Sequence, residues 1–143
     1  MEFKTATMED FDAAFDYIVK LWTYNTYDKE ETRKVYEKVL ADEDSFAFFL
    51  MDGNEYHGFC HGAYFNTFWM CGPTCYVSSI ISNEDERGKG NGVMLMDHAK
   101  ELAKARGCKA LVLDSGMPRT EAHRFYEIYG FEKSCYGFDY YIK

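Results

Sequence analysis

Three closely spaced glycines stand between an apolar run and a long helical pattern, and this arrangement restricts the fold more than any other feature. The apolar run extends from Cys75 to Ile81, and the helical pattern extends from Val93 to Arg106. The segment before the helical pattern reads Arg87-Gly88-Lys89-Gly90-Asn91-Gly92. Glycine permits positive φ angles and a close approach of the backbone to a ligand, and the unpaired N–H groups of a helix start favour an anion. The sequence therefore predicts a strand, a turn and a helix that together bind a phosphate group.

The spacing of these glycines excludes two common phosphate-binding motifs. The Walker motif requires four residues between its glycines and then Gly-Lys-Ser/Thr, and the dinucleotide fingerprint requires G-x-G-x-x-G. The segment from Arg87 to Gly92 instead reads R-x-x-G-x-G. It resembles the pyrophosphate-binding motif of the GNAT superfamily of N-acetyltransferases, which bind acetyl-coenzyme A (acetyl-CoA). A glycine-rich turn without a ligand is the alternative interpretation.

A second motif follows in the order that this superfamily has. Ala122 to Phe131 resembles its A-x-x-F-Y-x-x-x-G-F signature, with Phe125 and Tyr126 at the central positions. The resemblance covers nearly the whole chain. Within the superfamily, the second half is most similar to aminoalkylphosphonate N-acetyltransferases, through Arg119 to Tyr126 and Phe131 to Ser134.

Hydrophobic periodicity predicts an α/β (α+β) chain of one domain, residues 1–143, with about four helices. We expect strands at residues 3–6, 45–51, 55–65, 74–81 and 108–113, helices at residues 8–22, 29–41, 93–106 and 119–129, and a closing strand or hairpin from Phe131. This order mixes an antiparallel meander with a crossover helix and matches the GNAT fold. The resemblance implies a mixed, mostly antiparallel sheet whose strands splay apart at the cofactor site.

The C-terminal segment alternates aromatic or aliphatic residues with other residues, at Tyr136, Phe138, Tyr140 and Ile142. Such a strand, exposed at the edge of a sheet, is able to pair with a second copy. A homodimer is therefore the expected assembly.

Composition limits the class of protein and of partner. With 143 residues, 47% of them hydrophobic, the chain suits a single core, and it has no apolar run long enough to span a membrane. Five cysteines without a C-x-x-C pair and an N-terminus unlike a signal peptide indicate reduced thiols and a cytoplasmic protein. The formal net charge of −8 disfavours nucleic acid and favours a cationic small-molecule or peptide amine.

The resemblance implies a set of cofactor contacts. The pantetheine arm would lie against Ile80, Ile81 and Ser82. The pyrophosphate would contact the backbone of Gly88, Lys89, Gly90, Asn91, Gly92 and Val93, with Arg87 nearby. Tyr126 would protonate the leaving thiolate, since a phenol and a thiol have similar pKa values. A tyrosine that only packs in the core is the alternative.

The sequence leaves two alternatives for the group that deprotonates the amine. Many family members have a glutamate eight residues before the motif arginine, where this chain has Ser79. A serine is no base by itself, so either a water chain held by Ser78 and Ser79 or an imidazole such as His61 remains. Glu84 to Glu86 are expected to form a solvated acidic turn.

Further residues are candidates for contacts with the acceptor. His61, and Tyr24 in the aromatic loop from Trp22 to Tyr27, are candidate substrate contacts. Arg119 would contact an anionic group if the phosphonate resemblance holds, which conflicts with the cationic acceptor that the net charge favours. His57, His61 and the nearby cysteines match no zinc-ligand spacing, so no metal is expected.

These observations favour an N-acetyltransferase in which the amine attacks acetyl-CoA directly, because no cysteine or serine lies in a nucleophile motif. The main alternative is a non-catalytic acyl-CoA-binding or sensing domain, which the serine at position 79 would suit. A nucleotide-binding protein that uses the same glycine-rich turn is a second alternative.

Overall fold

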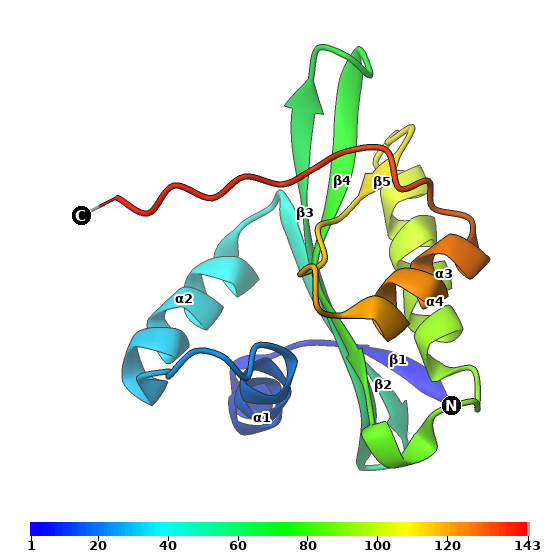
Figure 1. Cartoon of the computed structure of the whole chain (residues 1–143). Helices are drawn as coiled ribbons and strands as arrows, with labels where there is room; N and C mark the ends of the chain where they lie inside the picture. The colour runs from blue at the N-terminus through cyan, green and yellow to red at the C-terminus, as the bar shows by residue number, and fades with distance from the viewer. Residues whose placement is uncertain (143) are drawn as a thin grey trace. The chain divides into compact units, whose positions relative to one another are not determined.

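A five-stranded sheet forms the centre of the first of two units, Met1–Val112. The computed structural model describes residues 1–142 and places the strands side by side in chain order (Figure 1). The strands are β1 (Glu2–Thr5), β2 (Ser45–Asp52), β3 (Glu55–Thr67), β4 (Gly72–Ser82) and β5 (Leu111–Val112). β1 to β4 are antiparallel to their neighbours, and β5 runs parallel to β4. The predicted mixed and mostly antiparallel sheet is confirmed.

Helices cover both faces of this sheet. They are α1 (Phe11–Leu21), α2 (Lys29–Ala41) and α3 (Asn91–Ala105), with single 3₁₀ turns η1 (Met8–Asp10) and η2 (Glu84–Glu86). α1 and α2 lie on one face and α3 lies on the other (Figure 1). None of the helices within residues 1–142 is long and apolar enough to cross a membrane.

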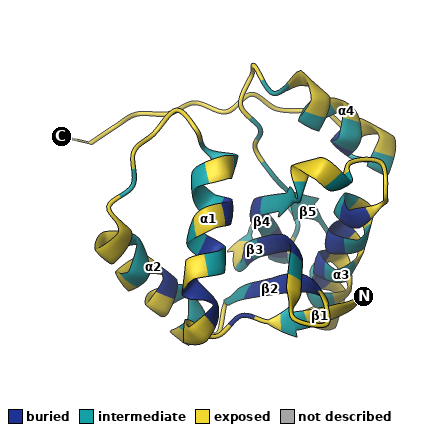
Figure 2. Ribbon diagram, turned by 90° about the horizontal axis from the view of Figure 1, so that it is seen from below, coloured by how far each residue is buried: buried dark blue, intermediate teal, exposed yellow. Residues whose placement is uncertain are grey.

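β2 is buried on both faces, which explains its nearly continuous apolar sequence. On one face Ala47, Phe49 and Met51 belong to a core cluster with residues of α1 and α2. On the opposite face the Phe48 ring contacts the His98 ring of α3, with centroids 4.5 Å apart. Figure 2 shows buried positions along the strands and on the sides of the helices that face them. Burial on both faces is unusual for an antiparallel strand, and it requires a helix layer on each side.

Asp10 ties the N-terminal elements together. Its carboxylate accepts hydrogen bonds from Lys4, at 2.7 Å, from the Thr7 backbone, at 3.0 Å, and from the Tyr56 hydroxyl. Burial would raise the pKa of Asp10, but the bonds from Lys4, Tyr56 and Thr7 outweigh that effect and lower it. β1, η1 and β3 are therefore joined by one buried, ionised side chain.

Two irregularities in the sheet matter for the site. His61 pairs with Ser79 and Gly62 pairs with Val77, so Ser78 is the extra residue of a bulge in β4. β4 and β5 pair only at Cys75 with Leu111 and at Tyr76 with Val112. From Val77 onward, β4 therefore pairs with β3 alone. Within the described part of the chain, no strand pairs with its other edge there. This open edge agrees with the splayed sheet that the resemblance implied.

The second unit begins at Leu113 and contains the helix α4 (Thr120–Tyr129). Gly130, at φ 127°, ends this helix as predicted. The predicted closing strand or hairpin is wrong, because residues 131–142 contain no strand. A strand requires a hydrogen-bonding partner, which periodicity alone does not provide.

The other predicted elements are confirmed with shifted bounds. The expected strand at residues 108–113 is reduced to Leu111–Val112. The strands expected at residues 55–65 and 74–81 are longer than predicted, because β3 extends to Thr67 and β4 begins at Gly72.

Candidate active site

The glycine-rich segment forms the turn that joins η2 to α3. Gly88 and Gly90 have φ angles of 83° and 84°, and a Cβ atom at either position would meet open space. These glycines are therefore required by backbone conformation rather than by crowding. Gly90 is the N-cap residue of α3, and Asn91 and Gly92 begin the helix.

The N-terminus of α3 has the properties of an anion-binding site. No side chain caps it, and its first turn contains no acidic residue. Asn91 is only 4% exposed, and its Nδ2 atom has no hydrogen-bond partner within the described residues. A buried amide donor without a partner is costly, so an acceptor group of a ligand would stabilise this turn. Arg87 and Lys89 are exposed beside it.

η2 is fixed to the sheet by a hydrogen bond between Glu86 and His57 of β3. The carboxylate oxygens of Glu86 lie 2.6 Å and 2.7 Å from His57 Nδ1, and this hydrogen bond lowers the pKa of Glu86. Glu84 and Asp85 are exposed, as expected, but the Glu86 side chain is only 13% exposed. The interpretation of all three residues as a solvated turn is therefore wrong for Glu86.

Asn83 strengthens this attachment at the end of β4. Its side chain accepts a hydrogen bond from the Tyr17 hydroxyl at 2.6 Å and donates one to the Tyr56 carbonyl at 2.9 Å. The start of the glycine-rich segment is thus joined to α1 and to β3 by side chains of low exposure.

The other predicted cofactor contacts lie on the open edge of the sheet. Ile80, Ile81 and Ser82 are half-buried in the last part of β4, where it pairs with β3 only. This edge leads into the uncapped start of α3 through eight residues, 83–90. An extended ligand with a diphosphate at one end fits such an arrangement.

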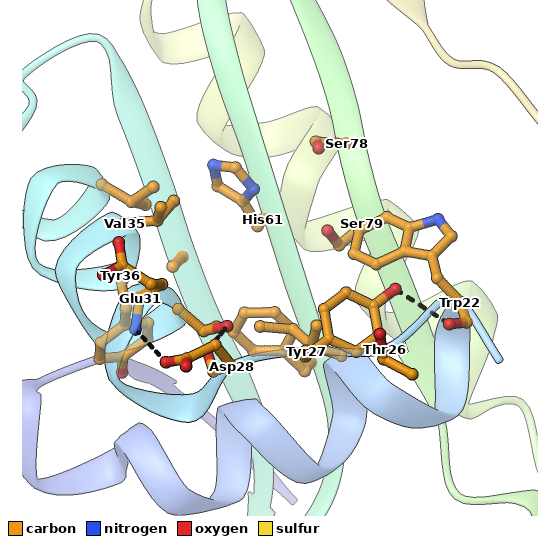
Figure 3. Close-up of a pocket in the computed structure, with 15 residues that line it drawn as sticks. Trp22, Thr26, Tyr27, Asp28, Glu31, Val35, Tyr36, His61, Ser78 and Ser79 are labelled. Carbon is orange, nitrogen blue, oxygen red and sulfur yellow. Dashed lines mark hydrogen bonds between the residues drawn. The ribbon is translucent and has the colours of Figure 1, made fainter. Parts of the chain in front are cut away.

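A cavity of about 400 Å³ lies between α1, α2 and the sheet (Figure 3). It is lined by Ile18, Trp22, Thr26, Tyr27, Asp28, Glu31, Thr32, Val35, Tyr36, Val39, Ala47, Phe59, His61, Ser78 and Ser79. Side chains of consecutive strand residues normally alternate between faces, so the bulge explains how both Ser78 and Ser79 reach the cavity. His61 is the register partner of Ser79. The structure therefore brings His61 and Ser79 together.

Burial lowers the pKa of the His61 imidazole below its ordinary value. His61 is consequently neutral at neutral pH and able to accept a proton. The cavity thus contains an imidazole that is able to act as a general base, next to Ser79, the serine that replaces the expected glutamate.

The aromatic loop between the first two helices contributes to the cavity, but not through the predicted residue. Tyr24 is 83% exposed and is not among the lining residues. Trp22 and Tyr27 line the cavity instead, and the Tyr27 hydroxyl donates to the Trp22 carbonyl at 2.9 Å. A contact between Tyr24 and a substrate remains a prediction.

Two acidic residues of the cavity were missed from the sequence. Asp28 is the N-cap residue of α2, and its side chain accepts from the Glu31 backbone at 2.9 Å. The pattern Asp28-Lys29-Glu30-Glu31 at a helix start was a usable signal for the cap. It gave no sign that Asp28 and Glu31 face a cavity.

Two predicted site residues belong to the second unit. Tyr126 is buried in α4 and packs against the rings of Phe125 and Phe131, with centroids 5.6 Å and 5.9 Å away. Arg119 directly precedes α4 and does not cap it with its side chain. Their roles toward the cofactor and the acceptor remain predictions.

Side chains that commonly bind metal ions are not clustered in the described part of the chain. Within residues 1–142, no group of three or more histidine, cysteine or acidic side chains is arranged to hold a metal ion. All five cysteines are free thiols.

Comparison with known proteins identifies the family. A family model described as "Acetyltransferase (GNAT) family" matches residues 6–131. An uncharacterized N-acetyltransferase of Bacillus subtilis (strain 168) is 36% identical over 55 residues, which are 38% of this chain and 39% of that relative.

Two solved structures share the fold. A structure described as a transcriptional regulator from Bacillus halodurans C-125 has a TM-score of 0.88 at 22% identity and covers 99% of both chains. The aminoglycoside N-acetyltransferase AAC(6')-Iy, in complex with CoA, has a TM-score of 0.87 at 15% identity, covering 99% of this chain and 94% of that one. Since the family model spans most of the chain and includes both motifs, the chain belongs to the GNAT family of acetyltransferases.

Proposed function

We propose that this protein transfers the acetyl group of acetyl-CoA to a primary amine by direct attack. The observation that carries this proposal is the position of β4. Its open edge leads to the uncapped start of α3, and its bulge turns Ser78 and Ser79 into the cavity. An acyl donor along the edge and an amine in the cavity would therefore meet at the same strand.

Acetyl-CoA fits the residues that surround this edge. The diphosphate would accept hydrogen bonds from backbone amides between Gly88 and Val93 and from the unpartnered Asn91 side chain. Arg87 and Lys89 would add positive charge, and Ile80 to Ser82 would offer backbone groups to the pantetheine arm. When bound, the cofactor supplies a thioester, which is an activated acyl donor.

The reaction requires two proton movements. The amine nitrogen forms a bond to the thioester carbonyl carbon, the carbon–sulfur bond breaks, and the products are an N-substituted acetamide and the thiol. When the neutral amine reacts, one proton leaves the nitrogen and one proton is added to the sulfur. An amine that enters as its ammonium first loses one further proton, which passes to the base and then to the solvent. A backbone N–H near the β4 bulge would stabilise negative charge on the carbonyl oxygen.

His61 is proposed as the acceptor of the amine proton. Its imidazole lines the cavity, lies in register with Ser79 and is neutral because burial lowers its pKa. Ser79, only 4% exposed, would orient the amine or a bridging water toward it. Tyr126 is proposed as the donor of the proton to sulfur, on the strength of its place in the second motif.

Tyr126→Phe tests the proposed acid and the reaction class. We expect kcat to fall by about 100-fold, because general acid catalysis contributes at least that much. The measurement is release of free thiol from acetyl-CoA with a panel of amines, together with the rise in Tm that acetyl-CoA causes. An unchanged kcat would rule out Tyr126 as the acid. A rise in Tm without turnover of any amine by the wild type would contradict acetyl transfer.

His61→Asn tests the proposed base. We expect kcat to fall about 100-fold for a strongly basic amine such as ethylamine, because its ammonium must lose a proton. The loss should be less than about tenfold for trifluoroethylamine, which is largely neutral at neutral pH. A general distortion of the cavity would affect both amines alike, so equal losses would contradict the role of His61.

We also propose that the C-terminal segment pairs with a second copy of the chain. Tyr136, Phe138, Tyr140, Tyr141 and Ile142 are between 80% and 93% exposed. Four buried aromatic side chains would cover roughly 600–1,000 Å² per copy. Two copies together reach the size of a stable interface, about 1,600 Å².

Phe138→Ser combined with Tyr140→Ser should convert the dimer into a monomer, because it removes half of the aromatic area. Sedimentation velocity of the full chain at micromolar concentration is the measurement. Phe68→Ser is the matched control, since Phe68 is fully exposed in the β3–β4 hairpin. A monomeric wild type, or a dimer that only the control disrupts, would contradict pairing through this segment.

A further inference from the structure

The charged groups of the cavity all carry the same sign. Of its fifteen lining residues, Asp28 and Glu31 are the charged ones, and no lysine or arginine of residues 1–142 is among them. The imidazole of His61 is kept neutral, because burial lowers its pKa. Within the first unit, the side chains that line the cavity therefore offer a ligand negative charge and no positive charge.

We propose that the acceptor is a small amine with an apolar body and no anionic group, and that a second ammonium group at its far end improves binding. This inference rests on the proposed function, since it names the substrate class of the same site. It also decides between the two acceptor classes that the sequence left open, a cationic amine and an aminoalkylphosphonate.

The walls of the cavity determine the body of the amine. Ile18, Val35, Val39, Ala47 and Phe59 supply aliphatic and aromatic surface from α1, α2 and the sheet. Burial of matching apolar surface on the ligand contributes about 25 cal/mol for each Å². The volume of about 400 Å³ is at the small end for ligand sites, and it suits an aryl or short alkyl chain better than an oligosaccharide.

Aromatic side chains of α2 and of the loop between α1 and α2 also favour the binding of a cation. Trp22, Tyr27 and Tyr36 line the cavity (Figure 3). The face of an aromatic ring attracts an ammonium group, most strongly where water is excluded. An amine that enters in its charged form is therefore attracted before it loses its proton.

The two carboxylates lie apart from the reacting end. Asp28 and Glu31 belong to the start of α2, whereas His61 and Ser79 lie on the sheet (Figure 3). Both acidic side chains are exposed, so they line the open side of the cavity. A diamine whose first nitrogen reaches Ser79 would place its second ammonium near this side.

The position of Asp28 is well defined. Its Oδ1 atom caps α2 through the Glu31 backbone, which restricts the side chain to one rotamer region. Glu31 is partly compensated, because Lys34 Nζ lies 3.2 Å from its carboxylate. Asp28 is therefore the stronger contributor to the negative potential.

Anionic acceptors are disfavoured for the same reasons. A phosphonate or carboxylate would lose hydration in an apolar cavity and would face two like charges. The charge of the cavity thus disfavours the phosphonate acceptor that the closer sequence resemblance suggested.

Matched amine pairs test the proposal. Phenethylamine and phenylalanine share one body and differ by a carboxylate, and pentylamine and 1,5-diaminopentane differ by a second ammonium. We expect kcat/KM to favour phenethylamine over phenylalanine by at least about 100-fold. The diamine should exceed pentylamine by about three- to tenfold, as expected for exposed charge pairs.

A double variant, Asp28→Asn with Glu31→Gln, assigns these preferences to the carboxylates. Asparagine caps helices as well as aspartate does, so α2 should be retained. In this variant the kcat/KM values of 1,5-diaminopentane and pentylamine should become equal. The ratio of kcat/KM for phenethylamine to that for phenylalanine should decrease. Glu30→Gln is the matched control, because Glu30 lies in the same helical turn, pairs with Arg33 and does not line the cavity.

The outcomes separate this proposal from the proposed function. The acceptor class is overturned, while acetyl transfer stands, if phenylalanine or 2-aminoethylphosphonate is acetylated as well as or better than phenethylamine. The same conclusion follows if the double variant leaves the ratios of kcat/KM unchanged. If no amine is acetylated, titration calorimetry of the same amines into the CoA-loaded protein decides. The expected order of affinities then supports the recognition and refutes only the reaction, and any other order overturns the recognition as well.

Discussion

The open edge of β4 is the constraint on which the site depends. Beyond Tyr76 this strand pairs with β3 alone, so one row of its backbone groups has no strand partner within the described residues. The bulge at Ser78 changes the direction of the same strand and exposes two consecutive serines to the cavity. In the proposed reaction, this one strand would bind an extended cofactor along its edge and an acceptor on its face.

The elements around β4 explain why this arrangement is stable. α3 packs on the opposite face, where Gly58 permits close contact, since a Cβ atom there would lie 2.8 Å from Leu95 Cδ1. The hydrogen bond of His57 with Glu86 and the hydrogen bonds of Asn83 fix the segment that leads from β4 to the glycines. The glycines themselves are then free to take the positive φ angles that an anion-binding turn requires.

Local signals in the sequence predicted much of this fold. The glycine-rich turn, the helices and the first four strands follow from periodicity and residue type over short windows, and the structure confirms them. Features that depend on contacts between distant segments were not predictable. The bulge at Ser78 depends on the register with His61, and the burial of Glu86 depends on His57, 29 residues earlier in the chain. The alternating pattern after Phe131 predicted a strand, but a pattern does not supply the partner that a strand requires.

We propose that backbone amides from Gly88 to Val93 bind the diphosphate of acetyl-CoA while β4 lies along its pantetheine arm. Titration of acetyl-CoA into ¹⁵N-labelled protein, followed by amide chemical shifts, tests it most directly. We expect the largest shifts at Gly88 to Val93 and at Ile80 to Ser82. Large shifts elsewhere, with these amides unchanged at saturation, would contradict it.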